Sequence, residues 1–168
     1  LKGSVLQGKD FTDGDEDASP SSSDDDPTHG TGMASIIAGH GHGSGAADGV
    51  MGLAPEAKIL PVRDNIKSDY SFADEIRYAV DHGASVINVS AYVGGEANAA
   101  DREAVAYALK KDVLIVAGAG NQNQDPNIEY PAKYPGVLAV GGVDKSGNFW
   151  SGSNHGPEVL LTAPATDI

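Results

Sequence analysis

The sequence predicts an α/β fold in three layers, in which a mainly parallel β-sheet is flanked by helices. Strand-like and helix-like segments alternate after residue 57, and this spacing favours right-handed crossovers between parallel strands. Residues 113–117 (VLIVA) form a continuous apolar run, typical of a strand that is covered on both faces. Glycine accounts for 22 of the 168 residues, nearly twice the usual share of roughly 7%, and indicates many tight turns in a globular chain.

The first helix of this alternation is expected between two strands. Residues 57–63 and 85–90 (SVINVS) have β-type patterns. Between them, Ser71 opens a helix with Asp74 as its capping-box partner, and Gly83 provides a C-terminal stop. The apolar positions of this helix fall on one face: Phe72, Ile76, Ala79 and Val80.

A second helix and three further strands complete the pattern. Asn98 is expected to cap the helix, and Asp101 stands at its third position. The apolar residues of this helix are Val105, Ala108 and Leu109. The later strands are expected at residues 113–117, 137–143 and 159–163. Sites in such folds lie at the carboxyl ends of the strands.

The charge of the chain is unevenly distributed. Eleven basic and 24 acidic residues give a net charge of −13, which argues against binding to a nucleic-acid backbone. Residues 10–26 hold eight of the acids and no base, so the remainder carries 16 acids against 11 bases. We therefore expect an acidic surface loop over residues 10–27 on a mildly acidic domain.

Part of this loop has the spacing of a calcium-binding loop. Positions 1, 3, 5, 7, 9 and 12 of that pattern are Asp13, Asp15, Asp17, Ser19, Ser21 and Asp24. Ala18 stands where glycine is preferred, and the last position is aspartate rather than glutamate. Two interpretations stay open, a Ca²⁺ loop and a solvated loop, and the residues favour the solvated loop.

Two absences exclude whole classes of protein. No uncharged apolar run approaches the ~18 residues that span a bilayer. The chain has no cysteine, which excludes a disulfide scaffold, thiol catalysis and a cysteine-ligated zinc site. Membrane anchoring would therefore need segments outside this chain.

Two polar residues are candidates for catalysis. His29 begins an apolar helical segment that has Gly30 and Gly32 in its first turn, where glycine is accepted if another backbone comes close or a side chain must be aimed. An imidazole at such a place can exchange protons. Asn121 directly follows the strand at residues 113–117 and Gly118-Ala119-Gly120, where its carboxamide can donate to a developing negative oxygen. Taken singly, each also fits a surface histidine or a turn asparagine.

The histidine- and glycine-rich segment at residues 39–48 allows two other site types. His40 and His42 form a His-x-His pair near Asp48 that allows a metal site, although the pair lies among glycine and serine. Glycines at residues 39–45 suggest a dinucleotide loop, but they follow a helix and lack the phosphate-binding spacing. We therefore assign neither a metal site nor a dinucleotide site to this segment.

Several segments in a fixed order carry a resemblance to a known family. They are His29-Gly-Thr-Gly-Met-Ala, Gly49-Val-Met-Gly-Leu-Ala-Pro55, Ala57-Lys-Ile-Leu-Pro-Val-Arg63, Val86-Ile-Asn-Val-Ser90, Val116-Ala-Gly-Ala-Gly-Asn121, Tyr134-Pro-Gly-Val-Leu-Ala-Val-Gly141 and residues 151–164 (SGSNHGPEVLLTAP). Together they resemble the subtilisin-like serine proteases over residues 1–11 and 28–168. The sequence around His29 and from Gly39 to Leu53 is most similar to mycosin-like actinobacterial members.

The resemblance implies a catalytic role for the two candidates. His29 would be the general base, which takes a proton from a serine and returns it to the leaving amine. Asn121 would be the side-chain donor to the oxyanion. The reaction would be endopeptidase cleavage of a peptide or protein substrate through an acyl-enzyme, without a cofactor.

The resemblance also implies substrate-binding residues. The segment from Ser90 to Gly94 would pair with the substrate backbone, although this chain has extra residues there compared with the family's Ser-Leu-Gly. The walls of the pocket for the residue before the cut would be Gly118, Ala119 and Gly120. Glu129 aligns with the pocket floor, where a carboxylate would favour Lys or Arg, and a surface Glu129 is the alternative. The family also implies a cis peptide bond between Tyr130 and Pro131.

Two parts of the family's triad have no counterpart in the chain. The Asp-Thr/Ser-Gly turn would precede Leu1 and the Gly-Thr-Ser nucleophile would follow Ile168. We therefore expect residues 1–168 to be a partial catalytic domain, with a sheet incomplete at both ends and no activity alone. The parent would be a secreted or surface-displayed bacterial protease. A peptide-binding pseudoprotease is the alternative.

Overall fold

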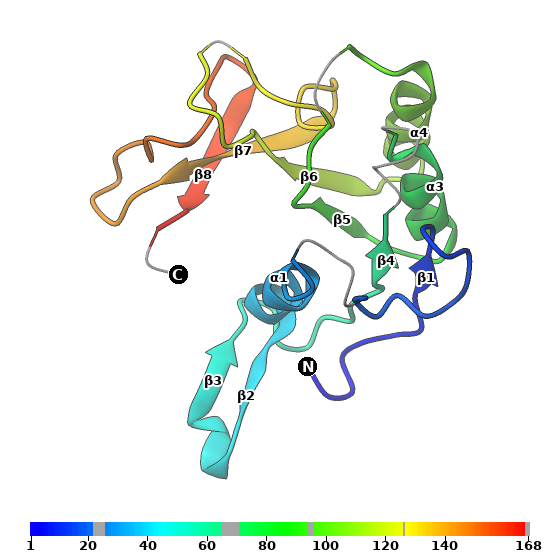
Figure 1. Cartoon of the computed structure of the whole chain (residues 1–168), viewed down its shortest axis with the longest axis vertical. Helices are drawn as coiled ribbons and strands as arrows, with labels where there is room; N and C mark the ends of the chain where they lie inside the picture. The colour runs from blue at the N-terminus through cyan, green and yellow to red at the C-terminus, as the bar shows by residue number, and fades with distance from the viewer. Residues whose placement is uncertain (22–25, 65–70, 94–95, 126, 167–168) are drawn as a thin grey trace. The chain divides into compact units, whose positions relative to one another are not determined.

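The computed structural model describes residues 1–21, 26–64, 71–93, 96–125 and 127–166 (Figure 1). The chain divides into two compact units, Leu1–Asn65 and Ile66–Ile168. We call them the N-terminal unit and the C-terminal unit and describe each by itself.

The C-terminal unit contains a four-stranded parallel sheet. Its strands are β5 (Val86–Val89), β6 (Leu114–Gly118), β7 (Val137–Val143) and β8 (Val159–Pro164), and they lie side by side in that order. Every neighbouring pair is parallel, as the sequence predicts. The carboxyl ends of β5, β6 and β7 consequently lie at one edge of the sheet.

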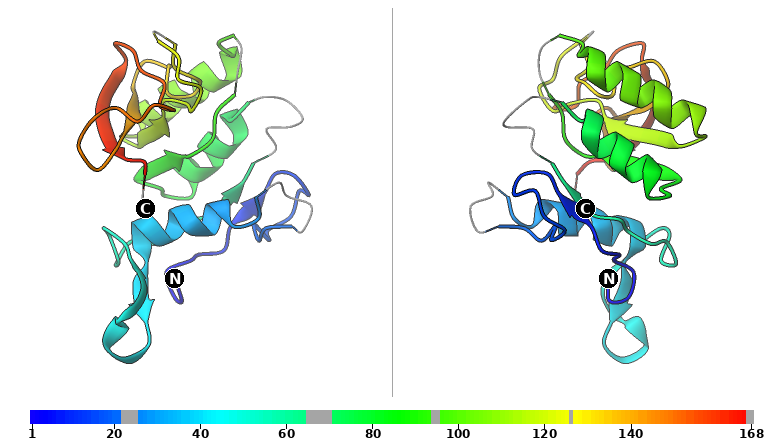
Figure 2. Two further views of the ribbon diagram at one scale, coloured as in Figure 1. Left: turned by 60° about the vertical axis from the view of Figure 1, so that its left-hand side comes forward. Right: turned by 90° about the vertical axis from the view of Figure 1, so that its right-hand side faces the viewer.

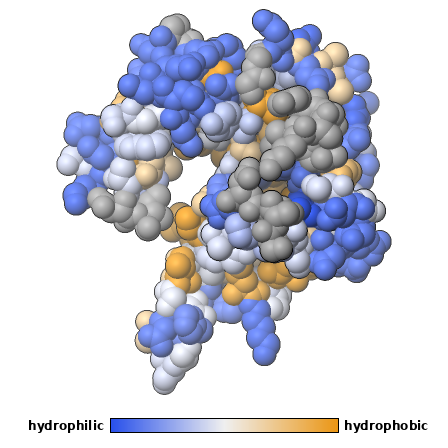
Figure 3. Space-filling model, viewed as in Figure 1, coloured by the Kyte–Doolittle hydropathy of each residue, from blue (hydrophilic) through white to orange (hydrophobic). Residues whose placement is uncertain are grey.

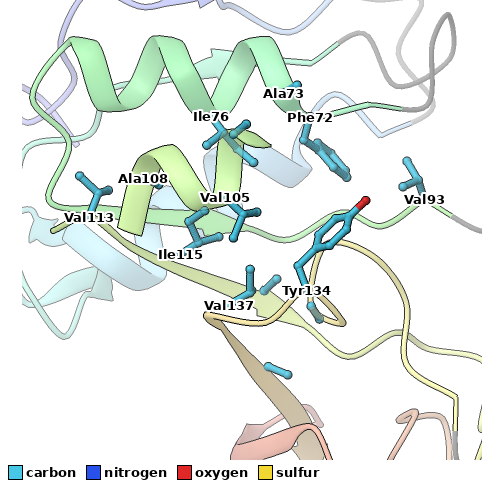
Figure 4. Close-up of a cluster of buried hydrophobic side chains, with 14 of the residues drawn as sticks. Phe72, Ala73, Ile76, Val93, Val105, Ala108, Val113, Ile115, Tyr134 and Val137 are labelled. Carbon is cyan, nitrogen blue, oxygen red and sulfur yellow. The ribbon is translucent and has the colours of Figure 1, made fainter. Parts of the chain in front are cut away.

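Two helices pack on one face of this sheet, α3 (Ala73–Asp81) and α4 (Ala99–Lys110). Figure 2 shows them lying next to each other, and Figure 4 shows the apolar cluster between them and the sheet. Ile76 and Ile115, at 1% exposure each, are among the most deeply buried members of this cluster. Burial of each such side chain contributes about 1.5–3 kcal/mol, so this cluster is the main stabilising element of the unit.

In the C-terminal unit taken by itself, described side chains on the opposite face of the sheet are exposed. Val86 is 58% exposed, Leu114 43% and Leu161 56%. Within β6, Ile115 and Ala117 are buried and Leu114 is exposed, because α3 and α4 both pack against the same face. The C-terminal unit by itself thus covers one face of this strand, and coverage of the other face stays a prediction.

The start of α3 uses Ser71, as expected, together with a residue from the next helix. The helix begins at Ala73, whose N–H donates to the Ser71 hydroxyl oxygen at 3.2 Å, and the amide of the preceding Phe72 donates to Asp101 of α4. Asp101 Oδ1 accepts hydrogen bonds from the Phe72 N–H at 2.9 Å and the Ser71 hydroxyl at 2.6 Å, and Asp101 is fully buried. Asp101 thereby joins the beginnings of the two helices.

The other helix signals are mostly confirmed. Gly83 has φ +84° just after α3, in the left-handed region that glycine favours. Asn98 caps α4, since its side chain accepts a hydrogen bond from the Ala100 N–H at 2.8 Å. Val105 and Ala108 are buried, but Leu109 is 48% exposed, contrary to the expected apolar face.

The N-terminal unit is built from shorter elements. Its strands β1 (Lys9–Asp10) and β4 (Val62–Arg63) are parallel. The strand β4 is much shorter than the strand predicted at residues 57–63. The helix α1 (His29–Ala38) leads into an antiparallel hairpin (Figure 2). The elements of this hairpin are β2 (His40–His42), the 3₁₀ turn η1 (Ser44–Ala46) and β3 (Asp48–Met51).

A polar contact joins β1 to β4. Asp10 is 1% exposed, and its Oδ2 lies 2.5 Å from the Arg63 guanidinium. Its Oδ1 accepts the N–H groups of Thr12 at 2.6 Å and Asp13 at 3.0 Å. Burial alone would raise the pKa of Asp10, but these hydrogen bonds and the Arg63 charge together lower that pKa below 3.8.

Apolar side chains lie at the surface of the N-terminal unit (Figure 3). The largest exposed ones are Val5, Leu6, Ile36, Val50, Met51 and Leu53. Among the residues that the structure describes in either unit, no helix has the length and apolar content needed to cross a membrane.

Candidate active site

His29 is the first residue of α1 and is exposed. The residue before it, Thr28, donates its hydroxyl to Asp26 Oδ1 at 2.7 Å and its N–H to the same oxygen at 3.0 Å. These two bonds, with a smaller contribution from the charge of His29, lower the pKa of Asp26. Asp26 therefore remains ionised next to the imidazole through the neutral pH range.

The two glycines in the first turn of α1 have open space around them. A Cβ added at Gly30 or Gly32 would meet nothing within 4 Å among the described residues. The close backbone approach expected from these glycines is therefore not seen in this part of the chain.

Asn121 lies just past the carboxyl end of β6, in the C-terminal unit. The strand ends at Gly118. The N–H of the next residue, Ala119, donates a hydrogen bond to the Val140 carbonyl of β7 at 2.9 Å. Asn121 is exposed, and its carboxamide has no hydrogen-bond partner among the described residues. A donor group is thus presented to solvent at the edge where α/β sheets bind ligands.

Glu129 is brought next to this segment. Its N–H donates to the Ala119 carbonyl at 3.0 Å, and its side chain is half-buried. A Cβ added at Gly120 would lie 2.9 Å from Glu129 Cγ, so the two residues are in close contact. The Tyr130–Pro131 peptide bond that follows is cis, as expected.

The proposed substrate edge lies on the other side of the same segment. Val93 N–H donates to the Tyr130 carbonyl at 2.9 Å in an antiparallel bridge. Ser90, at the end of β5, is exposed and its hydroxyl accepts from the Asn88 side chain at 3.0 Å. Gly94 lies outside the described residues. Residues 128–130 thus run between the Ser90–Val93 edge and the walls at Gly118, Ala119 and Gly120.

Sequence reasoning missed two residues that are linked to Asn121 through hydrogen bonds. Asn154, which is fully buried, and the neighbouring Gln122 form a hydrogen-bonded network with the backbone of residues 120–124. Asn154 lies in the loop before β8, more than 30 residues away in the chain. No local pattern in residues 151–164 distinguishes it from a turn asparagine.

The alternative metal sites are not supported by the described residues. His40 and His42 occupy different register positions of the hairpin, opposite Met51 and Asp48, and His40 Nε2 contacts the Lys2 carbonyl at 3.2 Å. No group of three histidine, aspartate or glutamate side chains in the described ranges could hold a metal ion.

The oxygens of the calcium-like loop are used locally. Asp13 pairs with Arg63 at 3.0 Å, and the side chains of Asp15 and Asp17 accept the N–H groups of residues 17 and 19. The loop is exposed over residues 12–17, which agrees with a solvated acidic loop, and Asp24 lies outside the described residues.

The fold and site define an α/β protein with an exposed carboxamide and a half-buried carboxylate near the carboxyl ends of parallel strands. The model of the Subtilase family matches residues 4–167, nearly the whole chain. The chain belongs to the subtilase family.

Two curated relatives and one solved structure illustrate the similarity. The chain is 40% identical to the "Thermophilic serine proteinase" of Bacillus sp. (strain AK1), with all of the chain and 40% of the relative covered. It is 35% identical to the "Major intracellular serine protease" of Bacillus subtilis (strain 168), with all of the chain and 54% of the relative covered. The chain thus spans about half the length of these relatives or less.

The protease domain of PatA, solved as a mutant, has the same architecture. The TM-score is 0.75 at 31% identity, with 98% of this chain and 66% of the other covered. This similarity confirms the expected three-layer α/β fold class. The resemblance to the mycosin-like branch stays a prediction.

Proposed function

We propose that the chain is part of the catalytic domain of a serine endopeptidase, to which it contributes His29 and Asn121. The observation that carries this proposal is the exposed carboxamide of Asn121, which has no hydrogen-bond partner among the described residues and lies at the carboxyl end of β6, near Glu129. Membership of the subtilase family supports the same reaction class.

In the proposed reaction, His29 acts as general base. It removes the proton from a serine hydroxyl as the oxygen attacks the scissile carbonyl, and later returns that proton to the leaving amine. Asn121 Nδ2 donates a hydrogen bond to the oxygen that becomes negative in the tetrahedral intermediate. In subtilisin, a member of this family, loss of the corresponding donor lowers turnover roughly 10²–10³-fold.

The serine and the carboxylate that orients His29 are proposed to lie outside residues 1–168. The share of the relatives that this chain covers, 40% and 54%, leaves room for them. A triad without its nucleophile has no covalent route, so the isolated chain is expected to be inactive.

The proposed substrate is an extended peptide that pairs with the Ser90–Gly94 edge. Its side chain before the cut would lie between Gly118, Ala119 and Gly120 and the floor at Glu129. The contact of Glu129 with Gly120 supports this placement. A half-buried carboxylate at the floor favours a cationic Lys or Arg side chain through charge-assisted hydrogen bonds.

This preference can be measured with matched peptides. The full-length protein should cleave a peptide with Arg before the cut about tenfold faster than its Leu counterpart, as expected for about 1.4 kcal/mol of charge pairing. Glu129→Gln should remove that difference by lowering cleavage of the Arg peptide. Equal cleavage of the two peptides by the unaltered protein would contradict the assignment.

The function itself is tested by active-site labelling. A fluorophosphonate probe should label the full-length protein covalently, and a zinc-selective chelator should leave labelling and peptide hydrolysis unchanged. Absence of labelling together with retained peptide binding would instead identify a peptide-binding pseudoprotease.

The cellular location is also a proposal. We propose a secreted or surface-displayed bacterial enzyme, but one relative is named an intracellular protease, so family membership alone does not fix the compartment. Immunodetection in the medium and cell-surface fractions of the source cells tests this, and recovery in the cytosol alone would contradict it.

A further inference from the structure

The buried Asn154 uses its whole carboxamide to bind one short segment. It is 0% exposed. Its Oδ1 accepts the N–H groups of Gln122 at 2.9 Å and Gln124 at 3.0 Å, and its Nδ2 donates to Gln122 Oε1 at 2.7 Å. Because two N–H donors face Oδ1, the orientation of the amide is fixed and Nδ2 must be the donor to Gln122.

Gln122 passes this orientation on to Asn121. The same Oε1 atom that accepts from Asn154 also accepts the Asn121 N–H at 3.0 Å. That bond is the one hydrogen bond of Asn121 among the described residues. The backbone position of the proposed oxyanion donor thus depends on an acceptor that Asn154 holds in place.

Backbone pairing reinforces the contact between the two loops. Asn154 N–H donates to the Gly120 carbonyl at 2.9 Å, and Asn123 N–H donates to the Gly152 carbonyl at 2.9 Å. Asn121 lies between these two anchor points. Its backbone is therefore held from the loop before β8, while its side chain stays unengaged.

The network leaves no space at Gly120. This residue has φ +111°, and an added Cβ would lie 2.4 Å from Asn154 Nδ2 and 2.8 Å from Gln122 Oε1. The proposed pocket wall therefore rests directly on the amide of Asn154. A shift of that amide would move Gly120 and Asn121 together.

We propose that Asn154 is a positioning residue that sets the place of Asn121 through Gln122. The inference rests on the proposed function, in which Asn121 donates to the oxyanion. A donor of this kind stabilises the transition state only when it is held in the productive geometry before the reaction. Asn154 acts through its neighbours and does not itself touch the substrate.

Asn154→Asp tests this with almost no change of shape. The new carboxylate keeps an oxygen for the Gln122 and Gln124 N–H groups, but it places an oxygen against Gln122 Oε1. Gln122 must then turn its NH₂ group toward residue 154, and Asn121 N–H loses its acceptor. In the full-length protein, kcat should fall about 10²-fold, as for a displacement of about 1 Å, while KM changes less than about threefold.

Asn148→Asp is the charge-matched control. Asn148 is exposed, and its side chain contacts only Asp144 among the described residues, at 3.4 Å. The control should leave kcat within about twofold of the unaltered protein, since a distant surface charge is largely screened by salt.

A double-mutant cycle separates positioning from a general effect on the fold. In an Asn121→Ala background, Asn154→Asp should lower kcat less than about threefold, because the group that it positions is already gone. An equal loss in both backgrounds, or no loss from Asn154→Asp alone, would overturn the proposal. If Asn154→Asp does not fold, Gln122→Met removes the shared acceptor and enters the same cycle.

Hydrogen exchange keeps this test apart from that of the function. Asn154→Asp should speed amide exchange in residues 120–124 of the full-length protein, and Asn148→Asp should not. If Asn121→Ala leaves peptide hydrolysis unchanged, the oxyanion role of Asn121 fails, and exchange then decides the positioning role alone. Unchanged exchange in Asn154→Asp would overturn the positioning of Asn121.

Discussion

The two units of the chain are stabilised in different ways. The C-terminal unit buries a continuous apolar cluster between α3, α4 and the sheet. In the described part of the N-terminal unit, Ala38 is the one fully buried apolar residue, whereas Asp10 is nearly as inaccessible and is paired with Arg63. The C-terminal unit therefore relies on apolar burial, and the N-terminal unit relies on polar contacts and backbone pairing.

This difference also divides the proposed catalytic groups. Asn121 belongs to the unit with the large core, where Asn154 and Gln122 hold its backbone. His29 belongs to the unit with little core, at the exposed start of α1. The donor is thus fixed within its own unit, whereas the base depends on a unit whose apolar residues, such as Leu53 at 94% exposure, are still open.

The largest expected difference between the two units is the loss of stability when an isoleucine on a helix of each unit is truncated. Ile76 on α3 is 1% exposed and Ile36 on α1 is 37% exposed. Ile76→Ala should lower the free energy of unfolding by about 2–5 kcal/mol, because it leaves a cavity in the core. Ile36→Ala should cost less than about 1 kcal/mol. Urea unfolding of the full-length variants measures both, and equal losses would show that Ile36 is buried in the intact protein.

The polar contact of the N-terminal unit should give the next largest effect. Asp10→Asn places an NH₂ group against the Arg63 guanidinium and removes a buried charge partner, so the free energy of unfolding should fall by about 1–3 kcal/mol. Asp144→Asn is the matched control in the other unit, because Asp144 likewise accepts the N–H groups of Ser146 and Asn148 but has no cation partner among the described residues. A control variant as unstable as Asp10→Asn would contradict a special role for the ion pair.

Acid should loosen the N-terminal unit before the C-terminal one. The pKa values of Asp10, Asp17 and Asp26 are lowered in the N-terminal unit, and the pKa of Asp144 is lowered in the C-terminal unit. A folded-state pKa below the unfolded value of 3.8 gives stability that is complete well above pH 3.8 and is lost as the pH falls through the folded-state value. Protonation therefore removes more stabilising carboxylates from the N-terminal unit.

The single tryptophan provides the readout. Trp150 lies in the C-terminal unit, which also contains all six tyrosines of the sequence, so intrinsic fluorescence reports that unit. Below pH 4, far-UV circular dichroism should begin to change at a higher pH than Trp150 emission. Coincident transitions would mean that the two units unfold together.

The regular part of the fold could be predicted because its signals are local. Helical spacing in residues 72–80 and apolar runs at residues 113–117 and 137–143 depend on near neighbours, and all correspond to observed elements. The contribution of Asp101 to the start of α3, beside Ser71, could not be predicted, because it depends on how the two helices pack.

The candidate site was predictable to a similar extent. Asn121, Glu129 and the residues of Gly118–Gly120 were found through family motifs, and the structure brings Glu129 against Gly120. The proposed role of Asn154 could not be predicted, because it rests on contacts with residues 120–124, far away in sequence. Such a role becomes visible only when two distant loops are placed side by side.

The most direct test of the account compares two histidines in the full-length protein. His29→Ala should lower kcat for peptide hydrolysis by about 10⁶-fold, the size of effect seen when the base is removed from subtilisin, a member of the same family. His82→Ala, at the exposed end of α3, should leave kcat within about twofold. A His29→Ala protein that keeps more than a tenth of the original kcat would contradict the assignment of the general base to the N-terminal unit.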